Sequence, residues 1–499
     1  MNNVRKSKLN FLISSLYQII AIALGLLIPR ITLFSYGSST NGLLSSALQF
    51  VGYLYLFEAG IQAVATKSLY KTVGNHDNAG TNSILAAVNK NYKRIGIYYL
   101  VGLVALSLVF PFLIKEENYS YVTVFSVVFF SGLSNVILFF FQGKYRILLQ
   151  VEGKSYFISL INIVTNVFNH ALKILLLYFK VDIALVVLGS FIISMIPAIA
   201  IMAYIKRKYT WIDLNAVPDF SALTQSKEAI AHQVSWMIFS STDTLILTIF
   251  CDLKVVSVYV VYKMICDYVF SFSKIPFESM SFRLGQLYNS DRNRFREYIN
   301  CAELLTSNVC FILFTVTLCL ITSFVDLYTN GINDINYVDQ KLAILFVLMQ
   351  LLNCMRTPML NTIGYAGHFR QTLISTIIET TINILVSIIG VLFWGIYGVL
   401  LGTIASLLYR TVDIIIYSNK ILLERNSKRT FSYYIVEWFL AAGIYILFVN
   451  LNITINSYLK FIAAGAILTI IVGSIFILSS YLLFREEYVF FKSNILKKR

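Results

Sequence analysis

Apolar runs of about 20 residues recur along the whole chain, and they limit the possible folds more than any other feature. A run of that length crosses the hydrocarbon core of a bilayer as a helix, whereas a β-barrel uses shorter segments of alternating polarity. The chain is 58% hydrophobic and only 13% charged. We therefore predict an all-α polytopic membrane protein with about 14 transmembrane helices. The predicted spans are residues 9–33, 41–66, 94–114, 121–142, 156–179, 183–205, 234–252, 255–275, 301–327, 339–357, 373–393, 397–417, 433–450 and 459–484.

Basic residues are distributed unevenly between the two sets of loops that these spans define. With the N-terminus in the cytoplasm, most of the 40 lysines and arginines fall in cytoplasmic loops, as the positive-inside rule requires. This predicts cytoplasmic termini and an even number of helices. Because the positive charges are spread over short loops, the net charge of +15 does not indicate nucleic-acid binding.

Cysteines and histidines give no pattern typical of a metal or redox site. The six cysteines lie in or beside apolar runs without a C-x-x-C pair, and the four histidines lack metal-ligand spacing. No Walker loop or dinucleotide fingerprint occurs either. We predict no metal site and no cofactor, with a proton or sodium gradient as a possible energy source.

Two weak internal matches share nearly the same offset of about 214 residues. Glu152-Gly153-Lys154 and Ala366-Gly367-His368 each precede a helix rich in Ile, Thr and Asn, and Ser68-Leu69-Tyr70 matches Gln286-Leu287-Tyr288. We interpret them as two parallel six-helix repeats, and transporters built from repeats bind substrate between the halves. The predicted division is a bundle at 1–205, a cytoplasmic linker at 206–233, a second bundle at 234–417, and two additional helices with a basic tail at 418–499.

The hairpin predicted at residues 234–275 carries three charges at bilayer depth, where an ionisable residue usually marks a functional site. Lys263 and Asp267 lie four residues apart on one helix face. They either form an intrahelical ion pair, or Lys263 faces a cavity and attracts diphosphate while Asp267 holds it in place. Asp243 is a candidate for ion coupling, or for pairing with Lys263.

Further intramembrane charges lie outside the hairpin. Arg30 either snorkels to the interface or lines the cavity, and for Glu58 ion coupling, sugar binding and a structural pair all remain open. Glu379 is a third candidate for ion coupling.

Other intramembrane residues favour structural roles. We expect Arg410 and Asp413 to form a structural pair and Arg356 to mark a helix end beside Thr357-Pro358. Of the neighbours His170 and Lys173, the lysine can snorkel outward and the histidine is more typical of a hydrogen-bonded core residue.

The chain resembles the bacterial oligosaccharide flippases that export O-antigen or capsule repeat units, within the multidrug/oligosaccharidyl-lipid/polysaccharide exporter superfamily. The resemblance rests on the 6+6+2 helix pattern and on Pro29-Arg30, the segment from Gly42 to Glu58-Ala59-Gly60-Ile61, Phe141-Gln142-Gly143-Lys144-Tyr145-Arg146 and Glu152-Gly153-Lys154. It has no catalytic signature and is spread over nearly the whole chain.

This resemblance implies movement of an undecaprenyl-diphosphate-linked oligosaccharide across the bacterial cytoplasmic membrane by alternating access, through a cationic cavity between helices 1, 2, 7 and 8. Membrane lipid and polysaccharide polymerase or assembly proteins are the implied partners. An ion-coupled drug exporter of the same superfamily is the first alternative. Short outer loops argue against an enzyme, and buried charges on several helices argue against a passive scaffold.

Overall fold

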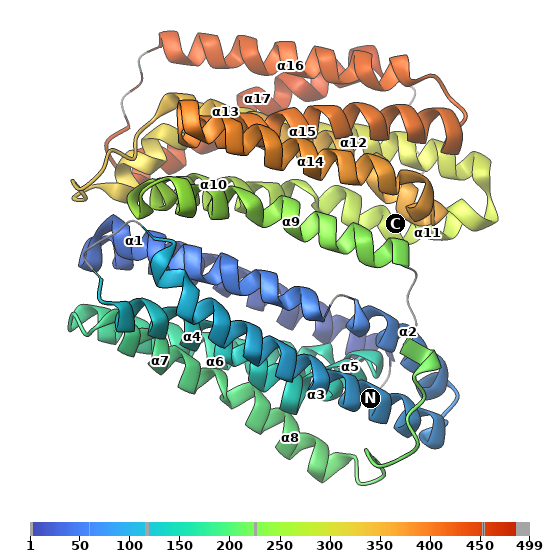
Figure 1. Ribbon diagram of the computed structural model, residues 1–499. Helices are drawn as coiled ribbons and strands as arrows, with labels where there is room; N and C mark the ends of the chain where they lie inside the picture. Colours follow the sequence, from blue (N-terminus) through green and yellow to red (C-terminus); the bar gives the residue numbers. More distant parts are fainter. Residues whose placement is uncertain are drawn as a thin grey trace. The chain divides into compact units, whose positions relative to one another are not determined.

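The computed structural model describes residues 3–58, 60–114, 119–223, 227–451, 453 and 455–485, and the chain divides into two compact units, Met1–Ser257 and Val258–Arg499. Every regular element in this described part of the chain is a helix (Figure 1). The N-terminal unit contains α1 (Asn3–Leu54), η1 (Tyr55–Phe57), α2 (Ile61–Gly74), α3 (Asn78–Val109), η2 (Phe110–Phe112), α4 (Tyr121–Ile137), η3 (Leu138–Gln142), α5 (Gly143–Val151), α6 (Ser155–Tyr178), α7 (Ile183–Ser194), α8 (Ile196–Lys208), η4 (Ser221–Leu223) and α9 (Lys227–Phe250).

The second unit starts within α10 (Leu253–Ser273), a helix whose first turn belongs to the N-terminal unit. The elements that follow are α11 (Ile275–Ser290), α12 (Arg292–Thr329), α13 (Gln340–Ala366), α14 (Phe369–Trp394), α15 (Ile396–Tyr417), η5 (Ser418–Leu422), α16 (Ser427–Asn450) and α17 (Tyr458–Leu483).

The predicted fold class is confirmed. Each predicted span other than 41–66 falls mainly on helical structure. Helix α1 contains the first span and most of the second, separated at Gly37, whose φ of 82° and ψ of 180° are not helical. Within the described residues, eleven helices are long and apolar enough to cross a membrane. Many apolar side chains on them stay exposed, as a chain surrounded by lipid requires. The orientation of the termini stays a prediction.

Two glycine turns recur at the offset predicted for the repeat. Gly153 has φ of 70° just before α6, and Gly367 has φ of 67° just before α14. Both adopt the left-handed conformation that glycine tolerates best, and such a residue ends one helix so that the next can start. The two turns are separated by the offset of about 214 residues found in the sequence.

A second pair of equivalent positions lies where α3 and α12 begin. Asp77 accepts a hydrogen bond from the backbone N–H of Gly80, and Asp291 accepts one from that of Arg294. Each aspartate is the N-cap of a helix that begins one residue later. Asp77 and Asp291 are separated by the same offset of about 214 residues as the two glycine turns. The same capping geometry therefore occurs at corresponding positions of the two halves. The boundaries 1–205, 206–233, 234–417 and 418–499 remain predictions.

The prediction of one continuous helix over residues 41–66 is wrong. The chain tightens into η1, passes through Gly60 with φ of 78°, and resumes a helix at Ile61. A helix broken at membrane depth leaves backbone groups without partners, and protein groups must satisfy them. Glu58 lies beside this break and is in position to accept hydrogen bonds from its backbone N–H groups.

The stretch after α8 is held against the N-terminal unit. Asn82 donates through Nδ2 to the carbonyl of Trp211 at 3.1 Å, and Ser68 donates to the carbonyl of Ala222 at 2.7 Å. Residues 209–223 thus follow α2 and α3 closely. Since α8 continues to Lys208 and α9 begins at Lys227, both ends of the predicted linker at 206–233 are helical.

Replacing Gly367 by alanine tests the paired turns. A Cβ there meets no atom within 4 Å, so the expected loss comes from the backbone alone, about 1 kcal/mol for a left-handed residue. The apparent melting temperature of the purified protein in detergent should fall by about 1–3 °C. Gly443→Ala is the control, because that helical glycine also has open space around it and is not left-handed. Equal melting temperatures for Gly367→Ala and wild type would contradict the assigned turn.

Candidate functional site

The hairpin of α9 and α10 forms as predicted. Asp252 accepts a hydrogen bond from the backbone N–H of Lys254 at 2.8 Å, which caps the start of α10 directly after α9 ends. In α10, Lys263 Nζ lies 2.9 Å from Asp267 Oδ2, so the predicted ion pair is present. Gln350 of α13 donates to the other Asp267 oxygen at 2.7 Å. Asp267 is therefore fixed from two helices and orients the lysine.

This ion pair is not sealed in the protein core. The Lys263 side chain is 25% exposed and that of Asp267 is 44% exposed. A lysine has three donor hydrogens, and one carboxylate oxygen uses only one of them. The geometry therefore leaves Lys263 able to contact an anion, while its role in substrate binding stays a prediction.

Asp243 is buried in the middle of α9, between the buried Thr242 and Thr244. This part of α9 packs on α1 through hydroxyl groups: the Tyr53 hydroxyl lies 3.2 Å from the Thr242 hydroxyl, and those of Ser46 and Thr248 are 2.7 Å apart. The aspartate thus belongs to a polar seam within the N-terminal unit. Its proposed part in ion coupling is untested by this arrangement.

Glu58 closes the helix break described above. Its Oε1 accepts hydrogen bonds from the backbone N–H of Gln62 at 2.8 Å and from the Tyr92 hydroxyl at 3.3 Å, and its carbonyl accepts from the N–H of Ile61. The carboxylate therefore satisfies the first turn of α2 in a buried position. These hydrogen bonds give Glu58 a structural contact at the helix break, while ion coupling and sugar binding by Glu58 stay predictions. Arg30 is half-buried in α1 directly after Pro29, and its role stays a prediction.

Glu379 belongs to a buried ion network in the second unit. One oxygen pairs with Arg356 and the other lies 3.4 Å from Arg410 Nε, while Arg410 Nη1 also lies 2.6 Å from Asp413. Arg410 is 2% exposed, and it donates to the Thr376 hydroxyl as well. The positive charges of two guanidinium groups are neutralised by the negative charges of two carboxylates. Buried charges are tolerated when they are paired in this way. The expected Arg410–Asp413 pair is confirmed.

The helices of this network approach closely because glycines face each other. A Cβ at Gly390 of α14 or at Gly398 of α15 would overlap the backbone of the opposite glycine. Such small-residue contacts bring membrane helices together and hold their polar side chains in register. The prediction that Arg356 marks a helix end is wrong, since α13 continues through Pro358 to Ala366 and carries Arg356 toward Glu379.

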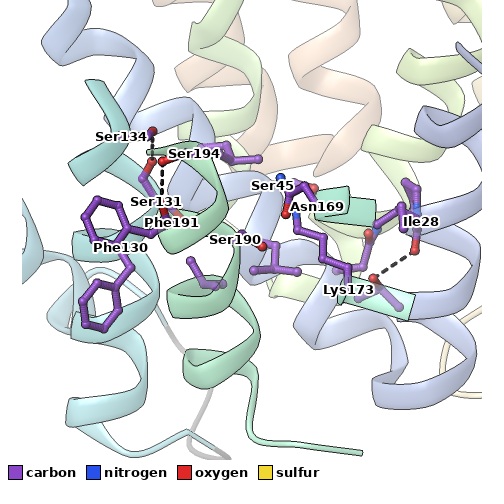
Figure 2. Close-up of a pocket in the computed structure, with 16 residues that line it drawn as sticks. Ile28, Ser45, Phe130, Ser131, Ser134, Asn169, Lys173, Ser190, Phe191 and Ser194 are labelled. Atoms are coloured by element: carbon purple, nitrogen blue, oxygen red, sulfur yellow. Dashed lines mark hydrogen bonds between the residues drawn. The ribbon is translucent and has the colours of Figure 1, made fainter. Parts of the chain in front are cut away.

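A cavity of about 290 Å³ lies inside the N-terminal unit, lined by sixteen residues from α1, α4, α6 and α7 (Figure 2). Among these, Lys173 is the charged residue, and none is acidic. Polar side chains from all four helices line the cavity. Six of them carry hydroxyl groups: Thr32, Ser45, Ser131, Ser134, Ser190 and Ser194. This cavity could not be predicted from the sequence, because single serines are common in apolar helices. Whether several of them face the same cavity depends on how the helices are rotated about their axes.

The two additional helices are attached to α12 by buried polar contacts. The Ser307 hydroxyl donates to Glu437 of α16, and Ser480 of α17 donates to Asn308 Oδ1 at 2.8 Å. All four side chains are buried. These helices are therefore an integral part of the second unit.

No model of a known protein family matches the sequence, and no curated protein matches it. Solved structures do show the same fold. One is a lipid II flippase, MurJ, in an inward closed conformation, with a TM-score of 0.65 and 16% identity over 95% of this chain and 98% of the other. An inward-facing MATE-family multidrug resistance transporter of the MOP superfamily gives a TM-score of 0.58 and 15% identity over 80% and 93%.

A third similar structure is the MATE multidrug transporter DinF-BH. Its TM-score is 0.56, at 16% identity over 83% of this chain and 94% of the other. This chain therefore has the fold of MATE and MurJ membrane transporters. The 5% of the chain outside the MurJ match is shorter than α16 and α17 together, so that match includes residues of the two additional helices.

Removing Glu379 should destabilise the protein strongly. Glu379→Ala leaves two buried arginines without their shared partner, and breaking a buried pair from one side costs about 3–5 kcal/mol. Glu424→Ala is the matched control, because Glu424 pairs with Arg296 at 2.6 Å but is 71% exposed, and such pairs contribute about 1 kcal/mol or less. Thermal unfolding in detergent compares them; a similar melting temperature for both variants would refute the structural role of the network.

Proposed function

We propose that this protein is a flippase that moves an undecaprenyl-diphosphate-linked oligosaccharide from the inner to the outer leaflet of the bacterial cytoplasmic membrane, for capsule, O-antigen or another surface polysaccharide. The observation that carries the proposal is the fold likeness to a lipid II flippase over 95% of the chain, which must include part of the segment formed by α16 and α17. The MATE transporters match 80–83% of the chain. The alternative is an ion-coupled drug exporter.

The substrate sets the physical problem. Sugars and a diphosphate cannot enter hydrocarbon without losing hydrogen bonds and charge solvation, at a cost of several kcal/mol for each polar group. A flippase replaces that solvation with its own polar groups while the polyprenyl tail stays in lipid. The protein exposes the site to each side of the membrane in turn, driven by a proton or sodium gradient for which Asp243, Glu58 and Glu379 are candidates.

Lys263 is the residue we assign to the diphosphate. It combines partial exposure with a fixed position, because Asp267 holds it and Gln350 holds Asp267. A compact ammonium is a suitable partner for a phosphate oxygen. Arg30, half-buried in α1, is the second candidate cation.

Variants at Lys263 can separate substrate binding from charge pairing. In a host lacking its own copy of the gene, lipid-linked repeat units should accumulate on the cytoplasmic leaflet, and the wild-type gene should restore export. Lys263→Ala should lower export about tenfold or more at an equal membrane level, since a charge-assisted hydrogen bond contributes about 1.5–3 kcal/mol. Lys263→Arg should retain most export.

The double variant Lys263→Ala/Asp267→Asn is the decisive control. It removes both charges of the pair, so no uncompensated carboxylate remains. If Lys263 binds diphosphate, the double variant stays defective; if Lys263 only neutralises Asp267, export recovers and the assignment is wrong. Normal arrival of repeat units at the outer leaflet in the deletion host would overturn the flippase proposal itself.

A further inference from the structure

The cavity of the N-terminal unit carries a positive charge, which would repel a cationic ligand. Lys173 supplies a positive charge from α6, and none of the sixteen lining residues is a carboxylate (Figure 2). Within the described part of the chain, no acidic side chain lies within ion-pair distance of Lys173. Lys173 is half-buried. An ammonium that is partly removed from solvent without a counter-ion is costly, and a bound anion lowers that cost. The first requirement on a ligand is therefore a negative charge.

The same cavity also requires a hydrogen-bond donor. Asn169 lies one helical turn before Lys173, and its Oδ1 is buried without a hydrogen-bond partner among the described residues. Four of the lining hydroxyls, including those of Thr32 and Ser194, donate to carbonyl oxygens of their own helices and keep their oxygens available as acceptors. A simple halide would neutralise Lys173 and leave these acceptors unused. A ligand that carries both a charge and hydroxyl groups would satisfy both.

The volume of the cavity suits a single sugar ring. A volume of about 290 Å³ equals that of about ten waters and lies at the lower end of small-molecule sites. The wall also contains Phe130 and Phe191, whose rings are stacked with centroids 6.3 Å apart and add an apolar surface to the polar one.

We propose that this cavity binds an acidic monosaccharide, with its carboxylate on Lys173 and a ring hydroxyl donating to Asn169. The ligand is either a free sugar acid or one unit of a glycan. The second case rests on the proposed flippase function; the first is independent of it. The site is distinct from Lys263, which belongs to the other unit.

Binding is tested on the full-length protein purified in detergent, by isothermal titration with sodium glucuronate, glucose and sodium chloride. We expect saturable glucuronate binding, with glucose and chloride at least about tenfold weaker. Lys173→Met keeps the length of the side chain without its charge and should weaken glucuronate binding about tenfold or more. Asn169→Ala, which keeps the charge, should weaken it severalfold.

Lys180→Met is the matched control, because Lys180 is exposed just beyond the end of α6 and does not line the cavity. Its glucuronate affinity should equal that of wild type. Absence of glucuronate binding, or equal binding by Lys173→Met and wild type, would overturn the proposal, as would equal affinity for glucose.

Export by the same variants identifies the source of the ligand. A loss of export in Lys173→Met but not in Lys180→Met assigns the site to an acidic unit of the carried glycan. Lost binding with normal export assigns it to a free sugar acid. Because titration needs no transport, a protein that fails to flip lipid-linked glycan can still bind glucuronate, and the two proposals fail separately.

Discussion

Inside hydrocarbon, every polar group must find its partner within the protein, and the features of this structure follow from that constraint. All the regular elements described are helices, which satisfy their own backbone. Serine and threonine hydroxyls repeatedly donate to the carbonyl four residues earlier, as Thr165 and Thr329 do. Charged side chains in the second unit form networks, and where α2 starts after a break, Glu58 accepts from its first turn.

The same constraint indicates a binding role for charged side chains that lack a complete set of partners within the protein. Lys263 is paired but partly exposed, and Lys173 points its charge toward a cavity without a carboxylate. A fully neutralised cluster such as that of Glu379 is suited to holding α13, α14 and α15 together. An accessible or uncompensated cation is suited to a ligand with negative charge. The division between structural and binding charges therefore depends on partners and exposure more than on depth in the membrane.

The sequence predicted the helices well because a membrane-spanning helix depends on local properties. Apolar length defines a span, and glycine is the residue that best tolerates the left-handed turns at Gly153 and Gly367. It also predicted the Lys263–Asp267 pair, which lies within one helix. Contacts between helices could not be predicted from the sequence, because they depend on how the helices are rotated and cross. Arg356 pairs with Glu379 in this way, and six hydroxyl side chains line the same cavity as Lys173. The break after Glu58 was missed because its neighbours are apolar enough to continue a helix.

The most direct test of the central claim is leaflet exchange in vesicles containing only this protein. Undecaprenyl-diphosphate-linked oligosaccharide carrying a fluorophore on its sugar is placed in both leaflets, and an external quencher reports the fraction accessible from outside. With an imposed ion gradient, we expect nearly all the label to become accessible in time, while protein-free vesicles retain about half. Identical quenching in both preparations, with a lipophilic cationic dye moved instead, would contradict the flippase account and favour the drug exporter.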